Sequence, residues 1–212
     1  MENLQKKADE ERINRDIEER KMWMAEAISK TRIPKRFIGA SLEQFNPGTN
    51  KLVEEFINGE SQGLFIYGTR GTGKTHLAAA IIKKILKNAS EHVKYHDLIP
   101  RASFVTIPGL LVDIRSTFNS KGGDTEEDVI SWASSRDFLI MDDMGAEKTT
   151  DWSMSTLYVI IDKRYSEMMP TIITSNMTVA EVAERVGDRI ASRIAGMCKV
   201  IELKGKDRRL NK

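Results

Sequence analysis

The stretch from Gly63 to Leu77 constrains this chain more than any other part of the sequence. An apolar, β-prone run at 63–67 leads into Gly68-Thr69-Arg70-Gly71-Thr72-Gly73-Lys74-Thr75, which matches the pattern G-x-x-x-x-G-K-[ST], and a run with helical spacing follows. Glycines let successive backbone N–H groups point at one anion, and the start of a helix adds its positive dipole end. The sequence therefore predicts a strand, a phosphate-binding loop and a helix, in that order.

The fixed side chains of this loop have defined chemical roles. Lys74 has the length to reach the outer phosphates of a nucleotide, and the Thr75 hydroxyl is suited to bind Mg²⁺. We therefore expect an ATP·Mg²⁺ site, with Thr75 also serving as a metal ligand. The residues expected to bind the nucleotide are Gly68, Thr69, Arg70, Gly71, Thr72, Gly73, Lys74, Thr75 and His76.

Composition and charge exclude several classes of protein. The 212 residues suffice for one α/β domain with an appendage, and the net charge of +2 argues neither for nor against a nucleic-acid partner. The single cysteine, Cys198, excludes an internal disulfide and a cysteine-based zinc site, which suits a reducing compartment. No apolar run approaches the length of a membrane span. We expect a cytoplasmic protein with no membrane partner.

Strand and helix patterns alternate along the rest of the chain. We expect residues 37–62 to form a lead-in segment with a turn at 46–48, and residues 88–101, after the helix that follows the phosphate loop, to form a polar loop. Expected strands are 64–67, 103–107, 138–141, 171–174 and 200–203, and expected helices are 110–118, 126–134, 152–165, 179–186 and one that Asp188 caps and Gly196 ends. This alternation predicts an α/β fold in which helices cover both faces of a parallel five-stranded sheet, within one domain at 37–212.

The first 36 residues differ from the rest in composition. Half of them are charged, eight acidic and ten basic, which predicts a separate helical extension at 1–36. Ile13, Ile17, Met24 and Ile28 share helical spacing, which indicates an amphipathic helix. Two interpretations stay open: a solvated helix that packs lightly on its own domain, and a helix that docks onto another protein.

Acidic residues follow the apolar run at 138–141. Carboxylates at the carboxyl end of a strand near the phosphate loop lie where Mg²⁺ and the attacking water need them. We expect Asp142 to hold the metal and Asp143 to act as the general base, with Glu147 as the alternative base. An acidic turn without a catalytic role is the competing interpretation.

Two further polar features gain meaning only in combination with the phosphate loop. Asn176 ends the fourth strand, where its amide is suited to hold a phosphate or the attacking water, although asparagine is also common in turns. Arg189 and Arg193 are four residues apart and thus share one helix face. A guanidinium can fork onto phosphate oxygens, but a surface arginine pair is the simpler interpretation of these two residues alone.

Taken together, these motifs resemble the AAA+ helicase loaders of the DnaC/DnaI type, and the related IstB-type transposition ATPases share the pattern. The resemblance covers about residues 33–209. It rests on the phosphate loop and on Ile33-Pro34-Lys35-Arg36-Phe37, Asp142-Asp143-Met144-Gly145-Ala146-Glu147-Lys148, Thr174-Ser175-Asn176 and Gly187-Asp188-Arg189-Ile190-Ala191-Ser192-Arg193-Ile194.

The resemblance implies a three-layer α/β/α P-loop NTPase that hydrolyses ATP slowly and loads a replicative helicase onto single-stranded DNA. It implies that Asn176 is the sensor-1 residue, that Arg193 is a finger offered to the ATP of a neighbouring subunit, and that Arg209 is the sensor-2 residue. Arg193 would then require self-association, and the N-terminal helix would contact the helicase. Arg115, Phe118 and Lys121 are candidate contacts to single-stranded DNA, with a plain surface loop as the alternative.

Three other functions remain open at this point. An IstB-type ATPase would assist a transposase on duplex DNA, and a scaffold would bind ATP without hydrolysing it. A small-molecule kinase would leave Arg193 unexplained, and the chain has no second basic cluster spaced to form a lid. Two departures from the family pattern also matter. Many AAA+ proteins have Asp-Glu where this chain has Asp142-Asp143, and the charged helix at 1–36 stands where cellular relatives often carry a Cys-rich zinc module.

Overall fold

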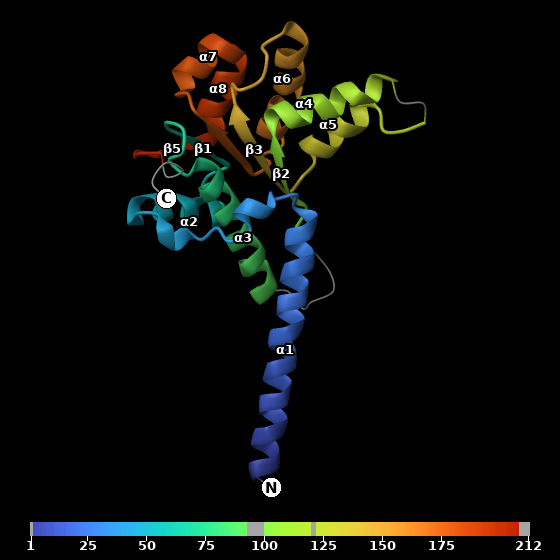
Figure 1. The fold of residues 1–212 in the computed structure, drawn as a ribbon, viewed down its shortest axis with the longest axis vertical. Helices are drawn as coiled ribbons and strands as arrows, with labels where there is room; N and C mark the ends of the chain where they lie inside the picture. The colour runs from blue at the N-terminus through green and yellow to red at the C-terminus, as the bar shows by residue number, and fades with distance from the viewer. Residues whose placement is uncertain (1, 93–99, 120–121, 208–212) are drawn as a thin grey trace.

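A computed structural model of the chain describes residues 2–92, 100–119 and 122–207. Five parallel strands form one sheet in the order β2-β3-β4-β1-β5 (Figure 1). Their bounds are β1 (Gly63–Tyr67), β2 (Ala102–Thr106), β3 (Phe138–Met144), β4 (Thr171–Ser175) and β5 (Cys198–Glu202). The predicted α/β class with a parallel five-stranded sheet is confirmed.

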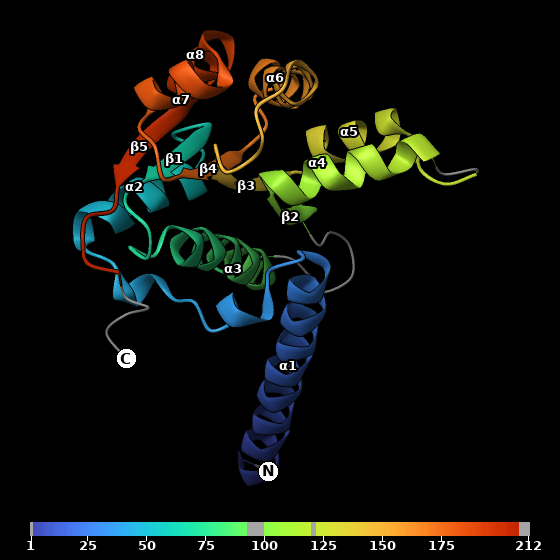
Figure 2. The same ribbon diagram turned by 45° about the horizontal axis from the view of Figure 1, so that its top comes forward.

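Helices cover both faces of the sheet. Alternate residues of a strand belong to two separate hydrophobic cores, one on each face. In β1, Leu64 and Ile66 belong to one core and Phe65 to the other. The first core is closed by α2 (Pro47–Ile57), α3 (Lys74–His92) and the end of α1 (Glu2–Lys30). The second is closed by α4 (Ile107–Ser116), α5 (Glu126–Ser134), α6 (Asp151–Ser166), α7 (Val179–Val186) and α8 (Asp188–Met197) (Figure 2). Short 3₁₀ helices occupy Lys35–Phe37, Leu42–Gln44 and Thr117–Asn119.

Helix α1 combines a packed end with a projecting end. Trp23 and Ala27 are buried in the core that α3 also lines. Beyond the helix, the Thr31 carbonyl accepts a hydrogen bond of 2.7 Å from the Phe104 amide of β2. The N-terminal part of α1 projects away from the rest of the molecule (Figure 1). The packed unit therefore begins before residue 37.

The apolar positions expected to form one stripe on α1 divide between these two ends. Met24 and Ile28 pack against the core, whereas Ile13 and Ile17 are 54% and 45% exposed. The C-terminal part of the helix thus packs on its own domain, as the first interpretation expects. Docking of the exposed part onto another protein stays a prediction. Among the residues that the structure describes, no helix is long and apolar enough to cross a membrane.

The expected lead-in at 37–62 contains α2, where the sequence predicts a turn at 46–48. Asn46 is the N-cap of this helix, and its side chain accepts a hydrogen bond of 2.9 Å from the Thr49 amide. Pro47 occupies the first helical position, where a missing N–H costs nothing. The residues expected to form a turn therefore start a helix.

Other boundaries also differ from the prediction. Helix α4 begins at Ile107, because the Thr106 side chain accepts a hydrogen bond from the Gly109 amide and Pro108 suits a first turn. Helix α8 has Gly187 as its N-cap with no side-chain hydrogen bond, so Asp188 does not cap it, and it continues past Gly196. In addition, α3 extends to His92, within the segment expected to be a loop.

Candidate nucleotide-binding site

The predicted phosphate loop occupies residues 68–73, between the end of β1 and the start of α3. Gly71 and Gly73 have φ angles of 77° and 103°, which favour glycine. At Gly68, an added Cβ would lie 2.2 Å from the Leu203 carbonyl oxygen, so the segment after β5 approaches too closely for any other residue. The loop conformation therefore depends on its glycines, as the sequence pattern requires.

Lys74 lies over this loop and is only 7% exposed. Its Nζ donates to the carbonyl oxygens of Gly68 and Thr69, at 2.8 and 2.9 Å, and to Asn176 Oδ1 at 2.8 Å. The ammonium is thus held where the turn of the loop meets the end of β4. A cation fixed beside a glycine-rich loop, at the start of a helix, suits the phosphates of a nucleotide.

Thr75 and Asp142 bring two oxygen donors together beside Lys74. Thr75 Oγ1 lies 3.3 Å from Asp142 Oδ2, and Thr174 Oγ1 donates to Asp142 Oδ1 at 2.7 Å. Burial raises the pKa of Asp142, which is 5% exposed, while the hydrogen bonds from Thr174 and Thr75 oppose that shift. A carboxylate and a hydroxyl at this spacing fit a hard divalent cation such as Mg²⁺.

Asp143 lies in a β-bulge at the end of β3. Met141 pairs with Ile173 and Met144 with Ser175, so Asp142 and Asp143 together oppose one residue of β4. Asp143 has a φ of 63°, which is uncommon for a residue other than glycine. The expected strand 138–141 therefore continues for three more residues, and the bulge falls at the two aspartates.

Asn176 connects the phosphate loop to this bulge. Its Oδ1 accepts from Lys74, and its Nδ2 donates to Asp143 Oδ1 at 3.2 Å. The side chain is exposed, so incoming groups have access to it. The structure thus brings together the expected residues Lys74, Asp143 and Asn176.

Glu147 occupies a different environment from the two aspartates. It is 5% exposed, and its Oε2 accepts a hydrogen bond of 2.8 Å from the Gly145 amide. Oε1 is buried and has no hydrogen-bond partner within the part of the chain that the structure describes. Glu147 also lines a cavity of about 270 Å³ together with Arg115 and Trp152. Its carboxylate is therefore held by the backbone just beyond β3.

Arg193 lies on α8, on the opposite face of the sheet from α3. Its Nε donates to Asp162 Oδ1 of α6 at 2.6 Å, and its guanidinium lies 5.0 Å from the centre of the Tyr165 ring. Hydrogen bonding to Asp162 raises the pKa of Arg193. The structure therefore does not bring Arg193 to the phosphate loop of its own chain. Arg209 lies outside the described residues, as does Lys121.

Arg189, one turn before Arg193, is exposed and lines a cavity of about 410 Å³ between α6 and the junction of α7 and α8. The two arginines that share spacing in the sequence therefore have different surroundings. Arg193 is engaged by α6, whereas Arg189 faces the surface.

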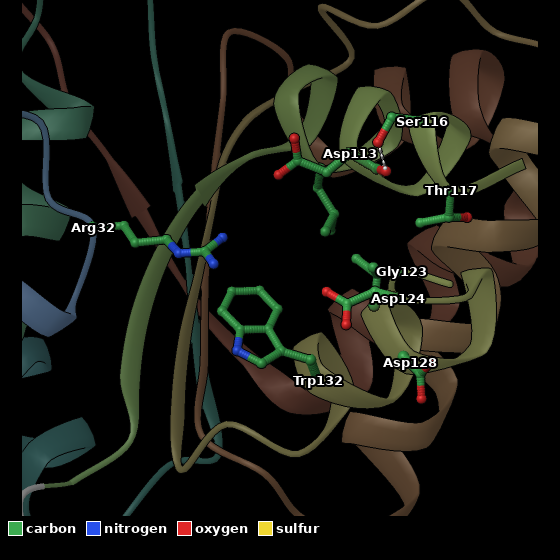
Figure 3. A pocket seen from close by; sticks show the side chains of 10 residues that line it. Arg32, Asp113, Ser116, Thr117, Gly123, Asp124, Asp128 and Trp132 are labelled. Carbon is green, nitrogen blue, oxygen red and sulfur yellow. Dashed lines mark hydrogen bonds between the residues drawn. The ribbon is translucent and has the colours of Figure 1, made fainter. Parts of the chain in front are cut away.

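A larger cavity, of about 540 Å³, lies between α4, α5 and the turn after α1. Figure 3 shows Arg32 and Trp132 on one side of it, and Asp113 and Asp124 on the other. The Arg32 guanidinium lies 4.5 Å from the centre of the Trp132 ring. This cavity contains none of the residues around Lys74, so it is separate from the nucleotide site.

Sequence reasoning missed Thr174 and Asp162 as functional candidates. Thr174 is 1% exposed and bonds to both aspartates of the bulge. Its only signal in the sequence is its position two residues before Asn176. Asp162 has no local signal, because its contact with Arg193 depends on how α6 packs against α8.

Sequence comparisons find replicative helicase loaders among the proteins that are similar to this chain. The chain is 28% identical over 142 residues to the replicative helicase loader DnaC of Escherichia coli K12, an alignment that covers 67% of this chain and 53% of that protein. A DnaC from Buchnera aphidicola subsp. Baizongia pistaciae is 26% identical over 182 residues, covering 82% of this chain and 70% of that protein. The chain thus spans about half the length of the E. coli protein.

Solved structures and a family model complete the comparison. A crystal structure of the DnaC helicase loader matches with a TM-score of 0.67 and 27% identity, covering 81% of this chain and all of that one. A DnaI structure matches with a TM-score of 0.64 and 25% identity, covering 82% and 96%. These neighbours confirm the AAA+ P-loop fold and the resemblance to the DnaC/DnaI type. The model for IstB-like ATP binding proteins matches residues 1–212, so the chain belongs to that family.

Proposed function

We propose that this protein is an ATP-hydrolysing helicase loader, which brings a replicative helicase onto single-stranded DNA in the cytoplasm. The observation that carries the proposal is the bonded set of Lys74, Asn176 and Asp143, next to the pair Thr75 and Asp142. In the proposal, Lys74 of this set is the phosphate-binding cation, Thr75 and Asp142 supply oxygen donors for Mg²⁺, and Asp143 supplies the carboxylate that acts on water. These are the groups that phosphoryl transfer to water requires.

Each residue of the set has a role in the proposed reaction. The N–H groups of the loop and Lys74 would hold the phosphates of ATP, and Thr75 and Asp142 would hold Mg²⁺. When bound there, Mg²⁺ would neutralise part of the charge on the phosphoryl group that is transferred. Asp143 accepts the proton of the attacking water, and Asn176 orients that water against the phosphate.

Asp143 is a better candidate for the general base than Glu147. Asp143 is partly exposed and bonds to Asn176, which in turn bonds to Lys74. Glu147 is buried and accepts its bond from the Gly145 backbone. A base must lie within hydrogen-bond reach of the water it activates, which favours the residue already joined to the phosphate-binding group.

Arg193 is proposed to act on the nucleotide of a neighbouring subunit. In a single chain it is paired with Asp162, a partner that an assembled neighbour could replace with phosphate oxygens. Hydrolysis would then depend on self-association. This dependence would link turnover to the formation of an assembly on the helicase or on DNA.

The proposed partners are a helicase and single-stranded DNA. The curated relatives are named as replicative helicase loaders, which supports the first partner. The exposed part of α1, with Ile13 and Ile17, is the proposed docking surface for the helicase. For DNA, Arg115 and Phe118 lie around Trp152, at 4.7 and 5.8 Å from its ring centre, and Phe118 is 53% exposed. Aromatic rings and cations of this kind stack on unpaired bases.

A loading assay tests the proposal. The host's purified replicative helicase would be mixed with this protein, ATP and a single-stranded DNA circle, and the helicase retained on the circle would be measured. We expect retention to rise with the protein and to be lost for Lys74→Ala. Retention that is the same without the protein would contradict the proposal.

Membership in the IstB-like family leaves one alternative to the loader function open, an ATPase that assists a transposase on duplex DNA. Binding of labelled single-stranded and duplex DNA, in parallel and with ATP, distinguishes the two. A loader prefers the single strand. Preference for the duplex, with no retention of helicase, would favour the alternative.

A further inference from the structure

The β-bulge in β3 removes a normal ladder partner from one backbone amide. Two residues, Asp142 and Asp143, oppose the single residue Thr174 across β3 and β4. Buried backbone N–H groups need a hydrogen-bond partner. The Asp143 amide finds one in a side chain, because it donates to Thr174 Oγ1 at 3.0 Å. A threonine hydroxyl thus replaces a backbone carbonyl at this point of the sheet.

The same hydroxyl is bonded to the neighbouring carboxylate. Thr174 Oγ1 donates to Asp142 Oδ1 at 2.7 Å, and the other oxygen of that carboxylate, Oδ2, lies 3.3 Å from Thr75 Oγ1. A hydroxyl has one proton and two acceptor lone pairs. Because its proton is used by Asp142, the hydroxyl can accept from Asp143, and the two bonds together fix its orientation.

We propose that Thr174 is a positioning residue of the ATPase centre, whose single hydroxyl sets the metal-binding carboxylate of Asp142 and the left-handed backbone of Asp143 relative to each other. This inference rests on the proposed function, since it concerns the metal and water side of the same site. Thr174 itself is 1% exposed, so it acts through the two aspartates rather than on the nucleotide.

Loss of the Thr174 hydroxyl would affect the binding of Mg²⁺ and the binding of the phosphates to different extents. Without the hydroxyl, Asp142 loses a short hydrogen bond and can turn away from Thr75, while the Asp143 amide loses its partner. Lys74 keeps its own bonds to the loop and to Asn176, which do not involve Thr174. Removing the hydroxyl should therefore weaken the binding of Mg²⁺ far more than the hold of the site on the phosphates.

Thr171 provides a matched control within the same strand. It is also a fully buried threonine of β4, and its hydroxyl also makes two hydrogen bonds, donating to the Met169 carbonyl at 2.8 Å and accepting from Arg164 Nε at 2.9 Å. It lies three residues from Thr174, about 10 Å along the strand. Thr171→Val thus removes an equivalent buried hydroxyl away from the aspartates.

The test is a titration of a fluorescent ATP analogue at a series of Mg²⁺ concentrations, with thermal unfolding of each variant measured alongside. For Thr174→Val, we expect the half-saturating Mg²⁺ concentration to rise about tenfold to a hundredfold, the range for a lost hydrogen bond to a charged group. Affinity for the analogue without Mg²⁺ should stay within about twofold of wild type. Thr174→Ser should restore the Mg²⁺ dependence, and Thr171→Val should leave it unchanged. If the valine variant is insoluble, Thr174→Ala takes its place with the same expectations.

The outcomes also separate this inference from the proposed function. If wild-type protein fails to bind the analogue, the nucleotide site itself is wrong. If wild type binds with Mg²⁺ and Lys74→Ala does not, but Thr174→Val keeps the wild-type Mg²⁺ dependence, then Thr174 is only a structural residue. An equal loss in Thr171→Val would lead to the same conclusion, because that variant shares only the loss of a buried hydroxyl.

Discussion

The phosphate loop and helix α8 each present a cationic side chain, but the chain holds the two in different ways. Lys74 is 7% exposed and bonds to the loop and to the end of β4. The Arg193 side chain is 34% exposed and bonds to one carboxylate, Asp162, whose side chain is 33% exposed. One cation belongs to a buried network of several elements, and the other to a surface ion pair.

This difference indicates which parts of the site are complete in one subunit. The loop, the proposed metal ligands Thr75 and Asp142, and the bulge are bonded to each other, so we expect binding of nucleotide to require little rearrangement of them. A surface ion pair is weak and can exchange its anionic partner. We therefore expect binding to be a property of the single chain and fast hydrolysis to be a property of the assembly.

The largest expected effect is on hydrolysis by the Arg193→Ala variant. Arginine fingers supply at least about a thousandfold in rate, because they neutralise charge that develops in the transition state. Assembly-dependent ATPase activity should fall by about that factor, while binding of a fluorescent ATP analogue stays near wild type. Arg189→Ala is the matched control, one turn earlier on α8, and should retain activity.

Mixing experiments extend that prediction. Arg193→Ala keeps an intact phosphate loop, and Lys74→Ala keeps an intact arginine. Some ATPase activity should return when the two variants are mixed, and it should increase with protein concentration. No recovery in samples shown to co-assemble would place Arg193 outside the site of the neighbour.

The next effect concerns the general base. Asp143→Asn keeps the size of the side chain but removes its basicity, so hydrolysis should fall by about a hundredfold or more while nucleotide stays bound. Glu147→Gln is the matched control and should change turnover far less. Phosphate release in single-turnover experiments measures both variants. Normal turnover in Asp143→Asn with a loss in Glu147→Gln would reverse the assignment.

A smaller effect is expected when Asp162 is neutralised. Asp162→Asn removes the anion that holds Arg193 within its own chain. Less interaction energy is then lost when the guanidinium moves to the nucleotide of a neighbouring subunit. At limiting protein concentration, ATPase activity should rise about two- to fivefold, the scale of an exposed ion pair. Steady-state assays over a range of protein concentrations check this. Loss of activity instead would mean that Asp162 places Arg193 correctly for its role.

Substitutions in the projecting part of α1 are expected to have the smallest effect on the nucleotide site. Ile13→Glu together with Ile17→Glu changes two exposed residues, so ATP binding and the melting temperature should stay near wild type while capture of the helicase is lost. A deletion through residue 30 is a poorer test, because it also removes Trp23 and Ala27 from the core. Unchanged helicase capture by the double variant would limit α1 to its packing role.

Local chemistry explains which parts of the molecule the sequence predicts. The phosphate loop depends on residues next to each other in the chain, and its strand, glycines and helix were all predicted. Helix α2 was missed because Asn46 and Pro47 suit a turn as well as a helix start. The bulge at Asp143 and its bond to Thr174 depend on the register between two strands, and the pairing of Arg193 with Asp162 depends on helix packing. Such contacts leave no pattern in a single sequence.

Nucleotide binding at Lys74 is the property on which every other proposed role depends. Titration of a fluorescent ATP analogue with Mg²⁺ into wild type and into Lys74→Ala, at equal fold stability, tests it in one measurement. Charge-assisted contacts of this kind contribute about 1.5–3 kcal/mol each, so the variant should bind about tenfold to a hundredfold more weakly. Equal binding by both proteins, or no binding by wild type, would contradict the assignment of residues 68–75 as the phosphate-binding site.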